Sequence, residues 1–197
     1  MNFGPDNFLT HVKETVMGGG RDSAGNPKLD SGFMVDHRND LLGSSVLATS
    51  VTRVTDSDGF PALSAAALIT AVANVGFTVP RDYDEETDTL VLRIVAKMAG
   101  ATDTPTLTID GEKRTLAAAP VAITPVSGSP TAALSTTAQA FELIYRGQGL
   151  VRGQDVQFTI TSAAHGTDAL QVQHIGVSYR STLVSYNRTD SSDNDLR

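Results

Sequence analysis

Histidines and carboxylates are the residues of this chain that could support metal or acid–base chemistry. The histidines are far apart in the sequence, at His11, His37, His165 and His174. No two of them have the HxH or HExxH spacing that brings a pair of imidazoles to one zinc ion. We therefore predict no metal site built on histidines and no cofactor, with His165 in a turn and His174 in an irregular strand.

The densest group of carboxylates lies in one loop and comprises Asp82, Asp84, Glu85, Glu86 and Asp88. Calcium takes several oxygen ligands, so this loop is a candidate for one cation. The spacing matches no EF-hand loop, and the alternative is a solvated loop whose charges keep the end of a sheet in water. The pattern alone leaves both interpretations open.

Nucleophilic and nucleotide chemistry lack the residues that they require. The chain has no cysteine, which excludes disulfides, thiolate metal sites and cysteine nucleophiles. It has no GxSxG elbow, and Gly147, Gly149 and Gly153 miss the GxGxxG spacing and lie between two expected strands. We predict that the protein is not an enzyme and has no catalytic residue.

Charge and hydropathy narrow the class of partner. Asp and Glu number 22 against 15 Lys and Arg, which gives a net charge of −7. An acidic chain without clustered basic residues disfavours nucleic acid, because that interaction depends on displacing counterions from phosphates. No apolar run approaches the roughly 18 residues that span a bilayer. We predict neither a nucleic-acid partner nor a membrane partner.

The stretch from Thr89 to Met98, which reads TLVLRIVAKM, is the clearest structural element in the sequence. Successive side chains of an extended chain point to opposite faces. One face is then apolar and carries Leu90, Leu92, Ile94, Ala96 and Met98. The other face places Val91 and Val95 beside Arg93 and Lys97, and we predict that Val91, Arg93 and Val95 contact another subunit.

Similar β-branched or alternating segments recur through residues 44–186. We expect strands at Ser44–Thr55, Leu68–Val79, Ala138–Arg146, Val156–Thr161 and Leu170–Tyr179. Alanines keep a helix open as the alternative for residues 62–73. We expect a hairpin turn at Asp110–Gly111 and, because the buried parity changes within the last of these strands, a bulge near Gln173–Gly176. The proline-bearing segment 117–135 should be loop or edge strand.

About eight short strands separated by turn signals, without a convincing long helix, predict an all-β protein. The length of residues 44–186 suits an antiparallel β-sandwich of the jelly-roll type, with two four-stranded sheets. Residues 187–197 read as a disordered polar tail.

Residues 1–43 differ in composition from the body and read as an extended N-terminal arm. A short amphipathic helix is expected from Asp6 to Met17, followed by a glycine-rich connector at 18–32. One interpretation is a frayed terminus, and the other is an arm that gains order against a partner. In the second case the apolar residues that contact the partner would be Phe8, Val12, Val16, Phe33 and Met34.

Two segments, 79–107 and 141–186, carry a family resemblance. They read VPRDYDEETDTLVLRIVAKMAGATDTPTL and FELIYRGQGLVRGQDVQFTITSAAHGTDALQVQHIGVSYRSTLVSY. This pattern resembles virion structural proteins of tailed bacteriophages, in particular small jelly-roll cement or decoration proteins of the capsid exterior. The resemblance implies a non-enzymatic protein that is made in the host cytoplasm and binds the major capsid protein on the virion surface. It also implies a homo-oligomer, with a trimer favoured over a dimer.

Two other functions are compatible with a jelly roll. A carbohydrate- or receptor-binding module, for example of a phage adhesin, usually presents aromatic platforms to sugar rings. This chain has no Trp and has four tyrosines, namely Tyr83, Tyr145, Tyr179 and Tyr186. A cupin-like metalloprotein needs clustered histidines, which the sequence lacks. The capsid protein is the main hypothesis and the carbohydrate- or receptor-binding module is the alternative.

Overall fold

The computed structural model describes residues 46–115, 117–130 and 132–180. These residues form ten strands in two five-stranded sheets, and the strand pairs are antiparallel. The described part of the chain contains no helix, and therefore none that is long and apolar enough to span a membrane. The expected all-β antiparallel sandwich of the jelly-roll type is confirmed.

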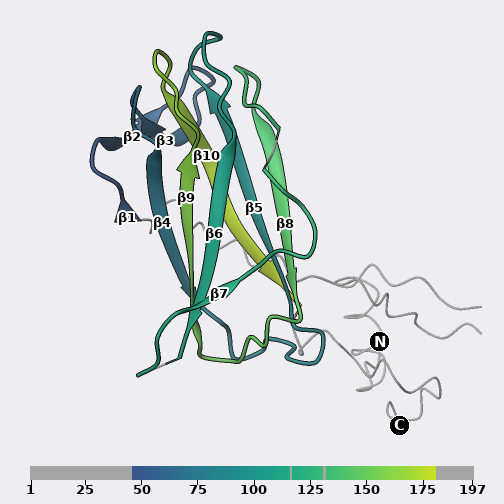
Figure 1. Ribbon diagram of the computed structural model, residues 1–197. Coiled ribbons are helices and arrows are strands. Elements are labelled where there is room, and N and C mark those ends of the chain that lie inside the picture. The colour runs from purple at the N-terminus through teal and green to yellow at the C-terminus, as the bar shows by residue number, and fades with distance from the viewer. Residues whose placement is uncertain (1–45, 116, 131, 181–197) are drawn as a thin grey trace, which may run out of the picture.

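The two sheets lie as two layers (Figure 1). The first has the order β2-β3-β10-β5-β8 and consists of β2 (Val51–Thr55), β3 (Pro61–Ala65), β10 (Leu170–Tyr179), β5 (Thr89–Met98) and β8 (Gln139–Arg146). The second has the order β1-β4-β9-β6-β7 and consists of β1 (Val46–Leu47), β4 (Ala71–Thr78), β9 (Asp155–Ser162), β6 (Leu107–Arg114) and β7 (Val121–Ile123).

The core lies between the sheets and follows from the period-two alternation of the strands. Leu92 and Ile94 of β5 face Phe158 and Ile160 of β9, and all four are fully buried. Tyr145 of β8 packs against Phe158 with ring centroids 5.4 Å apart. Burying a side chain of this size contributes about 1.5–3 kcal/mol relative to leaving it in water. The sandwich therefore holds both outward faces on a rigid support.

Two local expectations are wrong, and the helix left open as the alternative for residues 62–73 is not formed. The described part of the expected strand 44–55 is not one strand, because the chain turns at Ser50 (φ 69°) and places β1 and β2 in different sheets. Residues 62–73 contribute to the strands β3 and β4 instead of a helix. The count is ten strands in two five-stranded sheets instead of about eight in two four-stranded ones.

The expected hairpin turn at Asp110–Gly111 is also wrong, because β6 runs straight through these residues. Gly111 points into the core, where a Cβ atom would lie 2.8 Å from Ile123 Cγ1 and 3.2 Å from Phe158 Cε1. The glycine is therefore needed for close packing between strands and not for a turn.

The expected bulge is confirmed, since the register of β10 against β5 shifts between Val172 and His174. The proline-bearing segment supplies only the short edge strand β7, also as expected. The predicted arm (residues 1–43), its helix and the polar tail (187–197) lie outside the described residues.

Candidate functional site

The two described histidines lie in different parts of the fold, one in a buried hydrogen-bonded position and one at a bulge. His165 is buried, and its Nδ1 and Nε2 atoms lie 2.8 Å from the carbonyl oxygen of Asp168 and 2.9 Å from that of Ile69. His174 lies at the bulge with its ring over Gly176, where an added Cβ would come within 2.5 Å of Nε2. His11 and His37 lie outside the described residues.

Carboxylates of the acidic loop accept hydrogen bonds from hydroxyl groups of the protein itself. Asp82 accepts a hydrogen bond from the Tyr179 hydroxyl (2.8 Å), and Asp88 accepts one from the Tyr83 hydroxyl (2.9 Å). Asp84 accepts the Thr87 hydroxyl at 2.9 Å. No three His, Asp or Glu side chains among the described residues are grouped to hold a metal ion. These contacts favour a structural role for the loop over a cation site.

Three of the predicted contact residues lie on β5 and can be located. Val91 and Val95 are half-buried on its outward face, and the Arg93 side chain between them is 53% exposed. Arg93 Nε lies 3.8 Å from Glu142 Oε1 on β8. The other five predicted contacts, Phe8, Val12, Val16, Phe33 and Met34, lie outside the described residues.

The small number of aromatic residues counts against a sugar platform, and the three described tyrosines are unsuitable for one. Tyr83 and Tyr145 are fully buried, and Tyr179 is 2% exposed. Burial raises the pKa of Tyr145 to about 12, with a smaller contribution from the charge of Asp110. Tyr186 lies outside the described residues. A ring that packs inside the core cannot stack on a saccharide, so stacking on Tyr83, Tyr145 or Tyr179 is excluded.

The outward face of the second sheet carries polar side chains in rows. The strand register places Thr78, Asp155 and Arg114 side by side in one row across β4, β9 and β6. The next row holds Gly76, Gln157 and Glu112, and the one after it holds Asn74, Thr159 and Asp110. Side chains directly opposite one another on adjacent strands share a face of the sheet, so these groups form one hydrogen-bonding surface.

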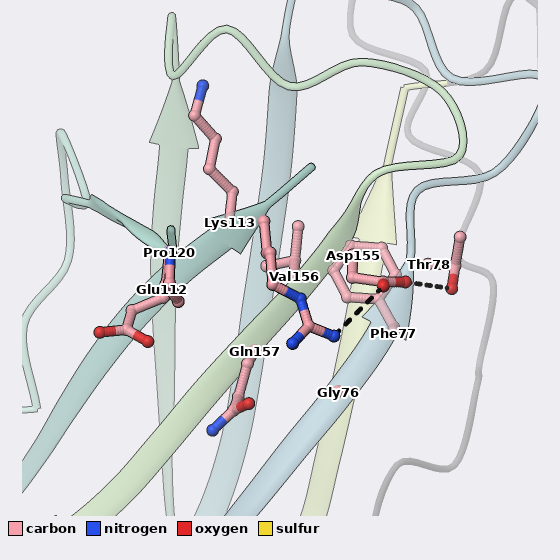
Figure 2. A pocket seen from close by; sticks show the side chains of 10 residues that line it. Gly76, Phe77, Thr78, Glu112, Lys113, Pro120, Asp155, Val156 and Gln157 are labelled. Atoms are coloured by element: carbon pink, nitrogen blue, oxygen red, sulfur yellow. Dashed lines mark hydrogen bonds and ion pairs between the residues drawn. The ribbon is translucent and has the colours of Figure 1, made fainter. Parts of the chain in front are cut away.

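A cleft of about 290 Å³ opens on this surface around Gly76, and we call it the Gly76 cleft. Figure 2 shows its two ends. At one end Thr78 donates a hydrogen bond to Asp155 (2.9 Å). The Arg114 guanidinium lies 3.8 Å from the same carboxylate. At the other end Glu112 and Gln157 hold exposed carboxylate and amide groups. Both hydrogen-bond donors and acceptors therefore line one hollow.

Gly76 creates the hollow because it has no side chain. A Cβ atom at this position would point outward and meet only the Val156 carbonyl oxygen, at 3.7 Å. The sequence alternation already placed Gly76 opposite the buried side of its strand, but it did not indicate which strands are its neighbours. A glycine inside a strand is itself a signal, since it often marks a position where another molecule approaches the backbone.

Comparison with known proteins gives similarity at the level of structure. No family model matches the sequence, and no curated protein sequence matches it. A Clostridium thermocellum xylanase structure of CBM22-1 and GH10 modules complexed with xylohexaose is similar with a TM-score of 0.50 and 10% identity, over 76% of this chain and 29% of that one. The CBM22-1 xylan-binding domain of a Paenibacillus barcinonensis xylanase is similar with a TM-score of 0.48 and 9% identity, over 75% and 92% of the two chains.

The likeness concerns the fold. This chain shares its fold with the matched part of the Clostridium thermocellum structure. At such low identity a common architecture does not carry a common activity, because binding sites are grafted independently onto the same fold. The resemblance to virion proteins stays a prediction.

Proposed function

We propose that the sandwich is a non-catalytic carbohydrate-binding module whose site is the Gly76 cleft. The observation that carries this proposal is the open hollow at Gly76, which is bordered by Arg114, Asp155, Gln157 and Glu112. Carboxylate, amide and guanidinium groups can together donate to and accept from the neighbouring hydroxyls of a saccharide. The shared sandwich fold supports the proposal only by giving a scaffold on which such sites occur.

Recognition in this cleft would depend on hydrogen bonds instead of ring stacking. Phe77 belongs to the cleft lining, but it is only partly exposed and packs parallel to Phe158, with centroids 6.5 Å apart. The polar groups that border the cleft lie on three adjacent strands and are held by the sheet ladder. The ladder fixes the backbones of these residues, so binding has to order only their side chains. We therefore expect a soluble oligosaccharide chain to be the ligand.

The test replaces the floor of the cleft. Gly76→Val adds a side chain into open space and should lower the affinity for a bound glycan about tenfold or more, which corresponds to about 1.4 kcal/mol. Calorimetric titration with xylohexaose and with β-1,4-galactotriose measures the affinity, and affinity electrophoresis in soluble polysaccharides widens the range of glycans. Gly166→Ala, at a loop glycine whose Cβ would also meet open space, is the control.

Two results would contradict the proposal. One is the absence of glycan binding by the full chain, and the other is glycan binding that Gly76→Val leaves unchanged. Chromatography of the glycans after incubation tests the non-catalytic part, and the release of shorter products would refute it.

A second candidate is the virion structural protein that the sequence resemblance implies, with a major capsid protein as partner on the capsid surface. The observation that favours protein docking is Leu68, an apolar residue that is 76% exposed. Its backbone φ is 70°, in the left-handed region. A branched residue rarely adopts this conformation, and such strain is concentrated at contact sites. A backbone hydrogen bond holds Leu68 in place, because the Leu68 N–H donates to the His165 carbonyl oxygen at 2.7 Å.

Co-sedimentation of the purified full chain with capsids tests this candidate. Leu68→Gly removes the strain and the apolar side chain together, so it should keep or raise the melting temperature while it weakens capsid binding. Deletion of residues 1–43 should abolish the binding if the arm is the clamp. Capsid binding that survives both changes would refute the two proposed contacts.

A further inference from the structure

The outward face of β5 and β8 combines aliphatic and charged side chains in register. We call this surface the β5–β8 patch, and its facing pairs are Val91 with Ile144, Arg93 with Glu142, and Val95 with Ala140. The aliphatic side chains of Val91, Val95 and Ile144 are half-buried, whereas Arg93 and Glu142 are 53% and 61% exposed. A charged row thus lies between two apolar rows.

A partner can reach the β5–β8 patch across its outward face but not along the free edge of β8. The free edge of β8 is occupied, because Val126 donates to the Ile144 carbonyl (2.7 Å) and Ile144 donates to the Ser127 carbonyl (2.8 Å). At the C-terminal end of β5, the loop that contains Asp56 covers Lys97, which is 2% exposed. An added strand cannot extend the sheet at this part of β8, so a partner must lie across the face.

The charged row is only loosely satisfied within the chain. Arg93 Nε and Glu142 Oε1 are 3.8 Å apart, which is beyond hydrogen-bond distance. Both groups therefore keep donors and acceptors for a partner that offers the same two charges in reverse order.

We propose that the β5–β8 patch binds a second copy of this chain across a two-fold axis that runs along the strands. Such an axis exchanges the positions of β5 and β8 and keeps each row at its height. Arg93 of each copy then meets Glu142 of the other, and Val91 of each copy meets Ile144 of the other. The apolar rows on both sides shield the four charges from water, which strengthens their attraction.

The opposite face of the sandwich provides a matched control. Arg114 and Asp155 are also 3.8 Å apart and similarly exposed, at 60% and 49%. Their neighbours in the next row are Gln157 and Glu112 instead of aliphatic side chains. This face has an equivalent ion pair but no apolar rows beside it, so we do not expect it to bind a second copy.

The experiment is sedimentation equilibrium of the full chain over a range of concentrations. We expect a reversible dimer, and Arg93→Glu or Glu142→Arg alone should raise its dissociation constant at least about tenfold, because like charges then face each other. The double exchange Arg93→Glu with Glu142→Arg restores complementarity and should bring the constant back to within about threefold of the original. Arg114→Glu should leave the constant unchanged.

Three outcomes would overturn the proposal. These are a monomer at every concentration, a closed trimer, and a dimer that responds equally to Arg93→Glu and Arg114→Glu. Circular dichroism and thermal unfolding establish that each variant is folded. If a charge variant does not fold, Val91→Lys is the substitute, and a dimer that tolerates a lysine there would equally refute the interface.

Discussion

The outward faces of the two sheets both carry an arginine–carboxylate pair with the same separation, but the surroundings of the two pairs differ. Arg93 and Glu142 lie between rows of aliphatic side chains on β5 and β8, and Arg114 and Asp155 lie beside the hollow at Gly76. One face therefore has apolar rows on both sides of its ion pair, and the other has a polar cleft beside its ion pair. The difference teaches that the neighbours of an exposed ion pair, and not the pair itself, indicate what a face can bind.

The largest effect is expected at the glycines of the second sheet. Gly111→Val should lower the free energy of unfolding by about 1–3 kcal/mol, because the added atoms overlap Ile123 and Phe158. Gly76→Val faces open space and should keep the stability or raise it by a few tenths to about 1 kcal/mol, since glycine weakens a strand. Urea denaturation measures both changes. Equal destabilisation would mean that Gly76 is a packing residue and that the cleft is not specialised for a ligand.

An intermediate effect is expected at the covered end of β5. The Gln173 side chain, aided by the backbone N–H groups of Phe60 and Asp58 and by the charge of Lys97, lowers the pKa of Asp56 from 3.8 to about 2. A carboxyl whose pKa is lower in the folded state adds stability above its unfolded pKa. That stability is lost as the pH falls from about 4 towards 2.

Asp56→Asn should therefore reduce the loss of melting temperature between pH 6 and pH 3. Thermal unfolding followed by circular dichroism at several pH values measures this loss. Asp110→Asn, on the open face of β6, serves as the control. An unchanged pH profile in Asp56→Asn would show that the loop over Lys97 does not depend on this charge. The end of the β5–β8 patch at Lys97 would then need revision.

The smallest effect is expected when either exposed ion pair is removed. In the monomer, Arg93→Ala and Arg114→Ala should each change the free energy of unfolding by no more than about 0.5 kcal/mol, because solvent screens both pairs there. Chemical denaturation of the two variants at a protein concentration low enough to keep the chain monomeric makes the comparison. A larger loss for Arg93→Ala that grows with protein concentration would indicate that the stability includes association.

Strand patterns were predictable where a strand has one apolar face. The alternation in residues 89–98 located β5 with both boundaries correct, and the parity change in residues 170–179 located the bulge of β10. The predicted turn at Gly111 was wrong, because Asp-Gly forms a turn only where the chain has room to reverse. Here Ile123 and Phe158 pack against that glycine from neighbouring strands, which no local pattern reports.

The candidate sites were less predictable than the fold. Val91, Arg93 and Val95 were placed on one outward face by alternation alone, and the structure adds Glu142 and Ile144 across from them. The Gly76 cleft was missed altogether, since its lining comes from β4, β6 and β9, which are far apart in the sequence. Which strands are neighbours, and in what register, is a long-range property of the packed chain.

By itself, the sequence determined that this protein buries one side of most of its strands, because alternating apolar side chains can leave water only by pairing two sheets. Only the tertiary structure decided that one outward face has a polar cleft and that the other flanks its ion pair with aliphatic side chains. The reason is that Gly76, Glu112 and Gln157 become neighbours through antiparallel register, and no segment of the chain encodes that register alone.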